Sequence, residues 1–190
     1  MSDTSRFLTA LGRVFRSLSG GRRSDATTPS RATDAAATAS VTTELLSPGQ
    51  GGPDATVEVD PSRLTRVRLA YSPSRDGDPD PGEIVWTWVP YEERDGRGKD
   101  RPVAIVAASD DGDFLAVQLT SKPHDGDRDH VALGTGAWDA SGRPSWARID
   151  RVFRVRAGGM RREAASLDAE RYARLTGALV GRYGWAPSRG

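Results

Sequence analysis

The segment SWARIDRVFRV, residues 145–155, places a basic and an acidic side chain two positions apart, at Arg148 and Asp150. Residues two apart on a β-strand share a face at a spacing of about 7 Å, so the guanidinium and the carboxylate would project together. The alternate positions Ile149 and Phe153 would then face a buried side. The pair offers an anion-binding group beside a proton acceptor, or it is a plain surface ion pair, which contributes little to stability.

Two further stretches carry residue types suited to chemistry on an anion. Arg101 precedes Pro102, which favours an extended backbone at the preceding residue and so places the guanidinium at the rim of a sheet. A rim arginine is either solvated polarity or a group that holds an anion. The segment LTSKPHD, 119–125, ends a strand with hydroxyls, a cation and an imidazole. It also suits an ordinary strand end followed by a turn at Pro123.

A local basic patch is the only electrostatic argument for a nucleic acid partner. Lys and Arg total 27 against 26 Asp and Glu, a net charge of +1, so the whole chain attracts no polyanion. Residues 148–162, however, hold six arginines against the single Asp150. Such a patch suits a phosphate backbone, although a solvated face is the usual explanation of a charge run.

The composition excludes several classes of site. The chain has no cysteine, which removes disulfides and thiolate chemistry, and its two histidines, His124 and His130, disfavour a structural zinc site. We expect no metal and no cofactor. No apolar run approaches the roughly 20 residues that span a bilayer, so we expect a soluble cytoplasmic protein.

The elements that must position these residues are mainly strands. Apolar or alternating runs predict strands over 83–89, 101–108, 113–121, 130–133 and 146–155. Strands this short without helical crossovers exclude a Rossmann-like sheet and predict a small, strongly bent antiparallel sheet or barrel. In the first strand, Ile84, Trp86 and Trp88 share one face, and the tryptophans are either core residues or a platform for stacked bases.

A single helix closes the chain. Ser166 or Asp168 can cap its beginning, and Gly184 ends it. Its apolar stripe is predicted to consist of Tyr172, Leu175, Leu179 and Tyr183.

The N-terminal part divides into three segments. Residues 5–18 predict a short basic amphipathic helix within a 1–18 segment, suited to weak contact with a membrane or a partner, or to folding back on its own domain. Residues 19–55 have the composition of a disordered linker. Residues 56–80 form an extended lead-in and loop, in which Asp60 followed by Pro61 could equally cap a helical turn.

The order and spacing of four motifs resemble the MazF and PemK family of toxin ribonucleases over about residues 81–185. The motifs are PGEIVW, RPVAIV, LTSK, and RID running on to GGMRRE. The resemblance implies an SH3-like antiparallel β barrel with a C-terminal α helix, a homodimer, and a separate antitoxin protein as partner. It also implies cleavage of single-stranded RNA without metal, which leaves a 2′,3′-cyclic phosphate.

The resemblance assigns roles to residues of this chain. The family's arginine before proline falls on Arg101, its strand-end threonine on Thr120, and the arginine and aspartate of PemK-type members on Arg148 and Asp150. Under this reading both arginines stabilise the charged transition state, Thr120 donates to the same oxygens, and Asp150 accepts the 2′-OH proton. His124 or an arginine could donate a proton to the leaving oxygen. The expected RNA-binding residues are Ser121, Lys122, Arg151, Arg154, Arg161 and Arg162.

Two alternatives remain open at the level of sequence. The barrel could be a noncatalytic module that binds RNA, DNA or a protein such as a topoisomerase, although such a module has no need of Asp150 in a phosphate groove. A peripheral membrane or scaffolding protein led by residues 5–18 is the third reading. The loop YEERDGRGKD, 91–100, also lacks the histidine that some family members carry there.

Overall fold

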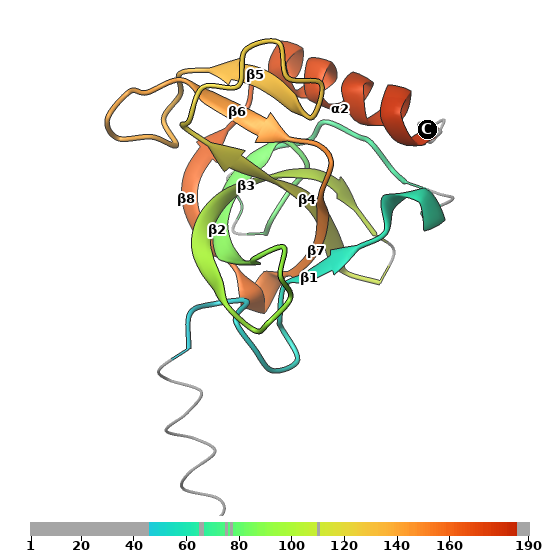
Figure 1. Ribbon diagram of the computed structural model, residues 1–190, viewed down its shortest axis with the longest axis vertical. Coiled ribbons are helices and arrows are strands. Elements are labelled where there is room, and N and C mark those ends of the chain that lie inside the picture. Colours follow the sequence, from blue (N-terminus) through green and yellow to red (C-terminus); the bar gives the residue numbers. More distant parts are fainter. Residues whose placement is uncertain (1–45, 65–66, 75, 77, 110, 186–190) are drawn as a thin grey trace, which may run out of the picture.

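The chain folds into a strongly bent antiparallel sheet with one helix packed against it, as seen in the computed structural model (Figure 1). The structure describes residues 46–64, 67–74, 76, 78–109 and 111–185. The predicted amphipathic helix over 5–18 and most of the predicted linker lie outside the described residues.

The elements follow one another along the described chain in a fixed order. They are β1 (Val57–Val59), a 3-10 helix (Pro61–Arg63), β2 (Glu83–Pro90), β3 (Gly98–Ala108), β4 (Asp113–Thr120), β5 (His130–Gly134), β6 (Ser145–Arg148), β7 (Val152–Arg156), a second 3-10 helix (Ala157–Gly159), β8 (Arg161–Ser166) and α2 (Ala169–Tyr183). The strands lie in the order β1-β7-β4-β3-β2-β8, and β6 joins β4 to β5. All of these pairs are antiparallel, which confirms the predicted small antiparallel barrel with a C-terminal helix.

The apolar run in β3 is continuous because its two faces meet two different cores. From Val103 to Ala107 every residue is buried. Val103 and Ile105 pack in a core between β2, β3, β4 and β7, whereas Val106 packs in a second core under α2. A strand that is buried on both faces carries apolar residues at successive positions, so its sequence does not alternate between apolar and polar residues.

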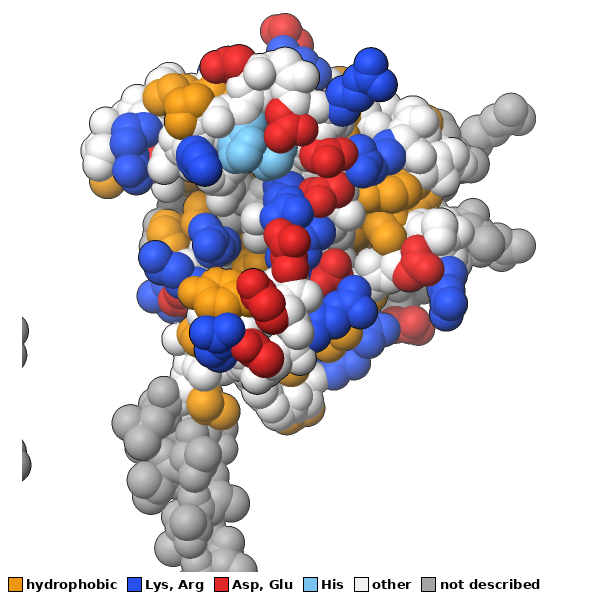
Figure 2. All heavy atoms as spheres, viewed as in Figure 1, with side chains coloured by type: hydrophobic (Ala, Val, Ile, Leu, Met, Phe, Trp, Pro, Cys, Tyr) orange, Lys and Arg blue, Asp and Glu red, His pale blue; other side chains and the backbone are white. Residues whose placement is uncertain are grey.

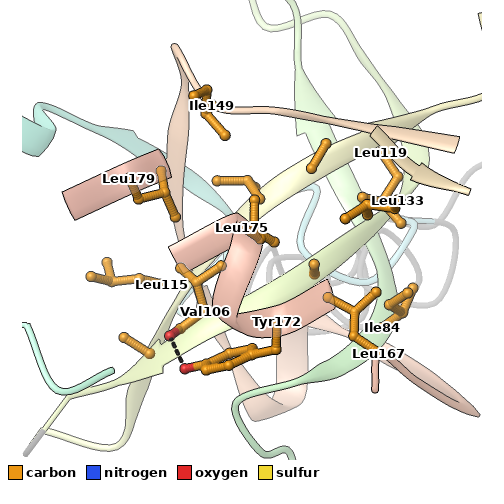
Figure 3. Close-up of a cluster of buried hydrophobic side chains, with 14 of the residues drawn as sticks. Ile84, Val106, Leu115, Leu119, Leu133, Ile149, Leu167, Tyr172, Leu175 and Leu179 are labelled. Carbon is orange, nitrogen blue, oxygen red and sulfur yellow. Dashed lines mark hydrogen bonds between the residues drawn. The ribbon is translucent and has the colours of Figure 1, made fainter. Parts of the chain in front are cut away.

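Helix α2 seals the second core as its apolar stripe predicts. Leu175 and Leu179 are fully buried among strand residues such as Leu115 (Figure 3). The β3–β4 register shifts between Ile105 and Ala107, and the carbonyl of the intervening Val106 accepts a 2.8 Å hydrogen bond from the Tyr172 hydroxyl. A bulge of this kind bends a sheet and leaves a backbone group free for another partner.

The ends of α2 are also those predicted. The Asp168 side chain accepts a hydrogen bond from the Arg171 N–H at 2.8 Å, which satisfies one of the unpaired donors at the helix start. Gly184 ends the helix with φ of 68°, a left-handed conformation that glycine adopts without strain.

The predicted single strand over 146–155 is wrong, because it consists of two strands separated at residues 149–151. The Ile149 N–H donates to the Asp129 carbonyl at 2.8 Å, and the Ile149 carbonyl accepts from the Tyr183 hydroxyl at 2.6 Å. A loop and the helix therefore take the backbone groups that a continuous strand would give to its neighbours.

Other strand predictions need smaller corrections. β8 was not predicted, since its sequence RREAAS does not alternate, and it lies at the edge of the sheet on β2. β3 begins at Gly98 rather than Arg101, because Gly98, Lys99 and Asp100 pair with the end of β2. Both readings of the lead-in hold in part: β1 is a strand, and Asp60 caps a helical turn by accepting from the Ser62 N–H at 3.0 Å.

The described residues before β1 contact the sheet, although the sequence predicts a linker up to residue 55. The Trp88 N–H donates to the Pro48 carbonyl at 3.0 Å. Gly49 has φ of 80° and lies so close to Thr87 that a Cβ would be 2.3 Å from its hydroxyl oxygen. Only glycine fits this approach, so the segment is held against β2.

Candidate functional site

Two neighbouring cavities share one side chain, that of Arg101. The first, here called the Trp86 cavity, has a volume of about 410 Å³ and is lined by Trp86, Arg101, Thr120, Ser121, Trp138 and Arg143, among others. The second, here called the Arg148 cavity, has a volume of about 370 Å³ and is lined by Tyr91, Glu92, Arg101, Gln118, Arg148 and Arg151, among others. Arg101 therefore connects the two into one site.

The strand register explains why these residues meet. Val103 on β3 pairs with Gln118 on β4, and two further steps outward along this register bring Arg101 opposite Thr120. Leu119 on β4 pairs with Ala147 on β6, and one further step brings Gln118 opposite Arg148. Side chains two apart share a face, so adjacent strands β3, β4 and β6 present these groups together.

Arg101 differs from the other arginines of the two cavities in its lack of a partner. Arg143 pairs with Asp139 at 2.9 Å, and Arg151 pairs with Glu58 at 2.7 Å. Within the described part of the chain, no carboxylate or hydrogen-bond acceptor contacts the Arg101 guanidinium. Its charge is thus directed at whatever enters the cavities.

Arg148, in contrast, is held by two carboxylates. Its Nε and Nη2 donate to the two carboxylate oxygens of Asp150 at 2.6 and 2.7 Å, and its Nη1 donates to Glu92 at 2.5 Å. The predicted side-by-side placement of Arg148 and Asp150 is present, with 22% and 21% of the two side chains exposed. Glu92 comes from the β2–β3 connection, 56 residues away in sequence.

The ion pair shifts the pKa of both partners. Partial burial alone would raise the pKa of Asp150, but the hydrogen bonds and charge of Arg148 outweigh it and lower the pKa below its ordinary value. The hydrogen bonds that Arg148 donates to Asp150 and Glu92 raise the pKa of Arg148 above its ordinary value, against the opposing effect of burial. Asp150 is therefore an ionised carboxylate whose basicity is suppressed while Arg148 contacts it.

Thr120 keeps a donor available. Its hydroxyl oxygen accepts a 3.1 Å hydrogen bond from the Lys122 N–H, which leaves the hydroxyl proton free to donate into the Trp86 cavity. Ser121 lines the same cavity, whereas Lys122 lies in the exposed connection after β4.

The predicted basic patch is largely neutralised by carboxylates. Arg151 is buried, Arg154 lies 3.4 Å from Asp113, and Arg161 lies 2.6 Å from Asp100. The side chain of Arg162 lies outside the described part. Of the predicted RNA-binding arginines, Arg151 lines the Arg148 cavity, and Arg161 packs over the Trp86 ring with its guanidinium carbon 5.9 Å from the ring centre.

His124 lies apart from both cavities. It contacts Asp127 and stacks on His130 in the β4–β5 connection, and it is not among the residues that line either cavity. Its expected role as a proton donor stays a prediction.

Glu92 and Gln118 are site residues that the sequence did not point to, whereas Trp86 is one of the two tryptophans that it reads as either core residues or a stacking platform. The core face of β2 carries Val85, Thr87 and Val89, so Trp86 is half-buried on the other face, at the cavity wall. Its indole N–H has no hydrogen-bond partner within the described residues. In EIVWTWVP both sets of alternating residues are apolar enough to be buried. The sequence alone therefore does not show which set faces the core; the packing of Val85 and Val89 against β3, β4 and β7 does.

Comparisons with known proteins bear on residues 80–180, which match the family described as PemK-like, MazF-like toxin of type II toxin-antitoxin system. Two crystal forms of MazE-MazF from Deinococcus radiodurans, Form-II and Form-III, are similar at 21% identity with a TM-score of 0.43, over 57% of this chain and 97% and 98% of theirs. The toxin MazF-mt6 of Mycobacterium tuberculosis is similar at 16% identity and a TM-score of 0.39, over 54% of this chain and 98% of that one. A search of curated proteins finds no match. None of the helices described is long and apolar enough to cross a membrane.

Proposed function

Because the chain belongs to the PemK-like, MazF-like toxins of type II toxin-antitoxin systems, we propose that it is an endoribonuclease that cuts single-stranded RNA without a metal ion. The observation that carries the proposal is the position of Arg101, which lines one cavity with Thr120 and the other with Arg148. A phosphate bound at Arg101 would therefore have Thr120 on one side and Arg148 on the other.

The proposed reaction is attack of a ribose 2′-OH on the adjacent phosphorus. The bond from O2′ to phosphorus forms as the bond from phosphorus to O5′ breaks, which leaves a 2′,3′-cyclic phosphate and a 5′-OH. Charge grows on the nonbridging oxygens, where Arg101, Arg148 and Thr120 can donate. Guanidinium forks suit this role because they match phosphate geometry and remain charged.

Asp150 accepts the 2′-OH proton in this proposal. It can do so only after Arg148 turns from Asp150 and Glu92 toward the phosphate, since the present ion pair suppresses its basicity. Substrate binding thus releases the base. The leaving O5′ must gain a proton, and in this proposal an arginine of the site donates it and is reprotonated from water, because His124 lines neither cavity.

The remaining features of the proposal come from the family. We propose a homodimer in the cytoplasm, neutralised by a separate antitoxin protein that covers the groove. The two Deinococcus radiodurans structures hold such a pair, MazE with MazF. Light scattering of the purified chain, alone and with its antitoxin, tests both associations.

The test of the activity is incubation of the purified chain with a long single-stranded RNA in EDTA, followed by mapping of the product ends. Products with a 2′,3′-cyclic phosphate and a 5′-OH are expected. The control variant is Arg174→Ala, which should cleave the RNA as the wild type does. It removes an exposed arginine of α2 that lies 3.7 Å from Glu170, away from both cavities. Intact RNA after incubation, or cleavage only when a divalent ion is added, would contradict the proposal.

One observation favours the second candidate, a noncatalytic binding module. Arg148 is already satisfied by Asp150 and Glu92, and most arginines of the basic patch have carboxylate partners. Under this reading RNA or DNA binds to Arg101 and the Trp86 cavity and is released uncut. Retention of RNA in a binding assay with no cleavage would favour it.

A further inference from the structure

Both histidines of the chain meet on one carboxylate in the β4–β5 connection. The Nδ1 atoms of His124 and His130 lie 3.2 and 2.9 Å from the same Asp127 oxygen, Oδ2. The two imidazole rings stack with centres 3.6 Å apart. One ligand atom from each of the three residues lies within 4.8 Å of the others.

The loop backbone fixes the direction of this carboxylate. The other oxygen, Oδ1, accepts the Asp129 N–H at 2.9 Å, and the His130 N–H donates to the Asp127 carbonyl at 3.2 Å. Gly126, with φ of 76°, makes the tight turn that brings His124 back toward Asp127. Since Oδ1 is held by the backbone, Oδ2 remains for the two rings.

We propose that His124, Asp127 and His130 bind a single transition-metal cation of the zinc type. Neutral imidazole nitrogens and a carboxylate oxygen are ordinary zinc ligands, and three protein ligands plus one water complete a tetrahedral shell. With metal–ligand bonds of about 2.0–2.1 Å, the ligand atoms of a tetrahedron lie about 3.3 Å apart. The observed nitrogen–oxygen separations of 3.2 and 2.9 Å are close to this value.

In the metal-free arrangement two ring protons occupy the position that a metal ion would take. Each ring must present an Nδ1–H to the shared oxygen, so two protons occupy the space between three ligand atoms. A cation replaces both protons, with each ring changing to the tautomer that carries its proton on Nε2. The rings, now parallel to within 7°, tilt toward each other to direct both lone pairs at the ion.

The burial of the site suits one open coordination position. The side chain of His130 is 7% exposed, that of His124 is 23% exposed and that of Asp127 is 38% exposed. His130, at the start of β5, is thus the buried ligand, and solvent reaches the site from the side of Asp127 and His124.

The proposed metal site adjoins the Arg148 cavity but is separate from it. His130 pairs with Arg148 in the β5–β6 register, and the carbonyl of Asp129 accepts the Ile149 N–H. Figure 2 shows the histidine side chains at the surface directly above a run of alternating basic and acidic side chains. The site uses no residue of the proposed cleavage reaction, so its test is independent of that activity.

Zinc binding by the untagged full chain, stripped of metal with a chelator, tests the proposal. Zn²⁺ alone is titrated by calorimetry, and the histidine ring signals are followed by NMR. With two histidines in the chain, both ring spectra report on this site. One ion per chain and a shift of both ring signals are expected.

Variants then locate the ion. His124→Ala and Asp127→Asn should each weaken zinc binding about tenfold or more, whereas Asp125→Asn, which removes a neighbouring charge outside the cluster, should leave it unchanged. Ring signals of the wild-type chain that stay in place under excess Zn²⁺ would overturn the proposal. Equal zinc affinity in the wild type and His124→Ala would overturn it as well, whatever the outcome for RNA cleavage.

Discussion

The two cavities that meet at Arg101 hold their cations in opposite ways. In the Trp86 cavity Arg101 has no acidic partner within the described residues, because the two carboxylates of that cavity, Asp100 and Asp139, contact Arg161 and Arg143 instead. In the Arg148 cavity the arginine is clamped between Asp150 and Glu92. Arg101 can therefore bind a phosphate directly, whereas Arg148 must first release its two carboxylates.

This difference separates binding from chemistry. A phosphate that binds to Arg101 breaks no ion pair of the protein. Arg101 therefore contributes its full attraction to RNA affinity. A phosphate that recruits Arg148 displaces Asp150, and the displaced carboxylate is the group that needs to be basic. Exchange at Arg148 thus couples correct placement of the phosphate to activation of the base.

Loss of either arginine should have the largest effect. Arg101→Ala and Arg148→Ala should each lower kcat/KM for a single-stranded RNA by about 10²–10³ or more, since each removes a donor to the transition state. Arg101→Ala should also weaken RNA binding, measured by fluorescence anisotropy, whereas Arg148→Ala should change it little. Wild-type cleavage by either variant would contradict the role of its arginine, and Arg174→Ala controls for loss of charge.

Removal of the base should lower kcat by a comparable factor but should leave RNA binding intact. Asp150→Asn should lower kcat by about 10²–10⁴. In the wild type the rate should fall only below the ordinary aspartate pKa of about 3.9, because the Asp150 pKa is lowered and the carboxylate stays ionised above it. A pH–rate profile of kcat/KM between neutral and acidic pH measures this limb. An acidic limb that persists in Asp150→Asn would assign it to another group.

The same lowered pKa predicts a contribution to stability. A carboxyl whose pKa is lower in the folded state stabilises the fold above its unfolded pKa, and the contribution is lost as the pH falls through the folded value. Thermal unfolding of the wild type should therefore lose stability on acidification that Asp150→Asn does not lose.

The aromatic wall of the Trp86 cavity should contribute to affinity alone. If a base stacks on Trp86, Trp86→Leu should weaken RNA binding by roughly 5–150-fold, the equivalent of about 1–3 kcal/mol per stacked base. Trp88→Leu is the matched control, since Trp88 lies on the same face of β2 but lines neither cavity. Equal losses in the two variants would mean that Trp86 only supports the sheet.

Removal of the negative charge of Glu92, which pairs with Arg148, should have the smallest effect, and it should raise RNA affinity rather than lower it. Glu92→Gln removes a competitor of the phosphate and should raise RNA affinity about two- to fivefold, as expected for an exposed ion pair. Glu93→Gln makes the same change of charge at the next residue, which lines the same cavity. Only an effect larger in Glu92→Gln than in Glu93→Gln supports displacement of Glu92.

Local patterns were sufficient for the parts of the molecule that local contacts determine. The capped helix α2, the strands β2 to β5 and the contact of Arg148 with Asp150 all follow from spacing along one segment. The break between β6 and β7 does not, because it depends on hydrogen bonds of Ile149 to a distant loop and to α2.

The electrostatic state of the site was likewise beyond local reasoning. Six arginines within 15 residues predict a positive patch, but the five whose side chains the structure describes pair with carboxylates, among them Glu58 for Arg151 and Glu92 for Arg148. The choice of the buried face of β2 also needed the fold, since valine and tryptophan alternate there with equal apolar character.

The most direct test is a crystal structure of the chain with a short RNA that carries 2′-deoxyribose at the cleavage position, so that the 2′ nucleophile is missing. We expect one phosphate in contact with both Arg101 and Arg148, the Glu92 side chain displaced, and the Asp150 carboxylate facing the 2′ carbon. A phosphate bound by Arg101 while Arg148 still contacts Asp150 and Glu92 would contradict the exchange on which the account depends.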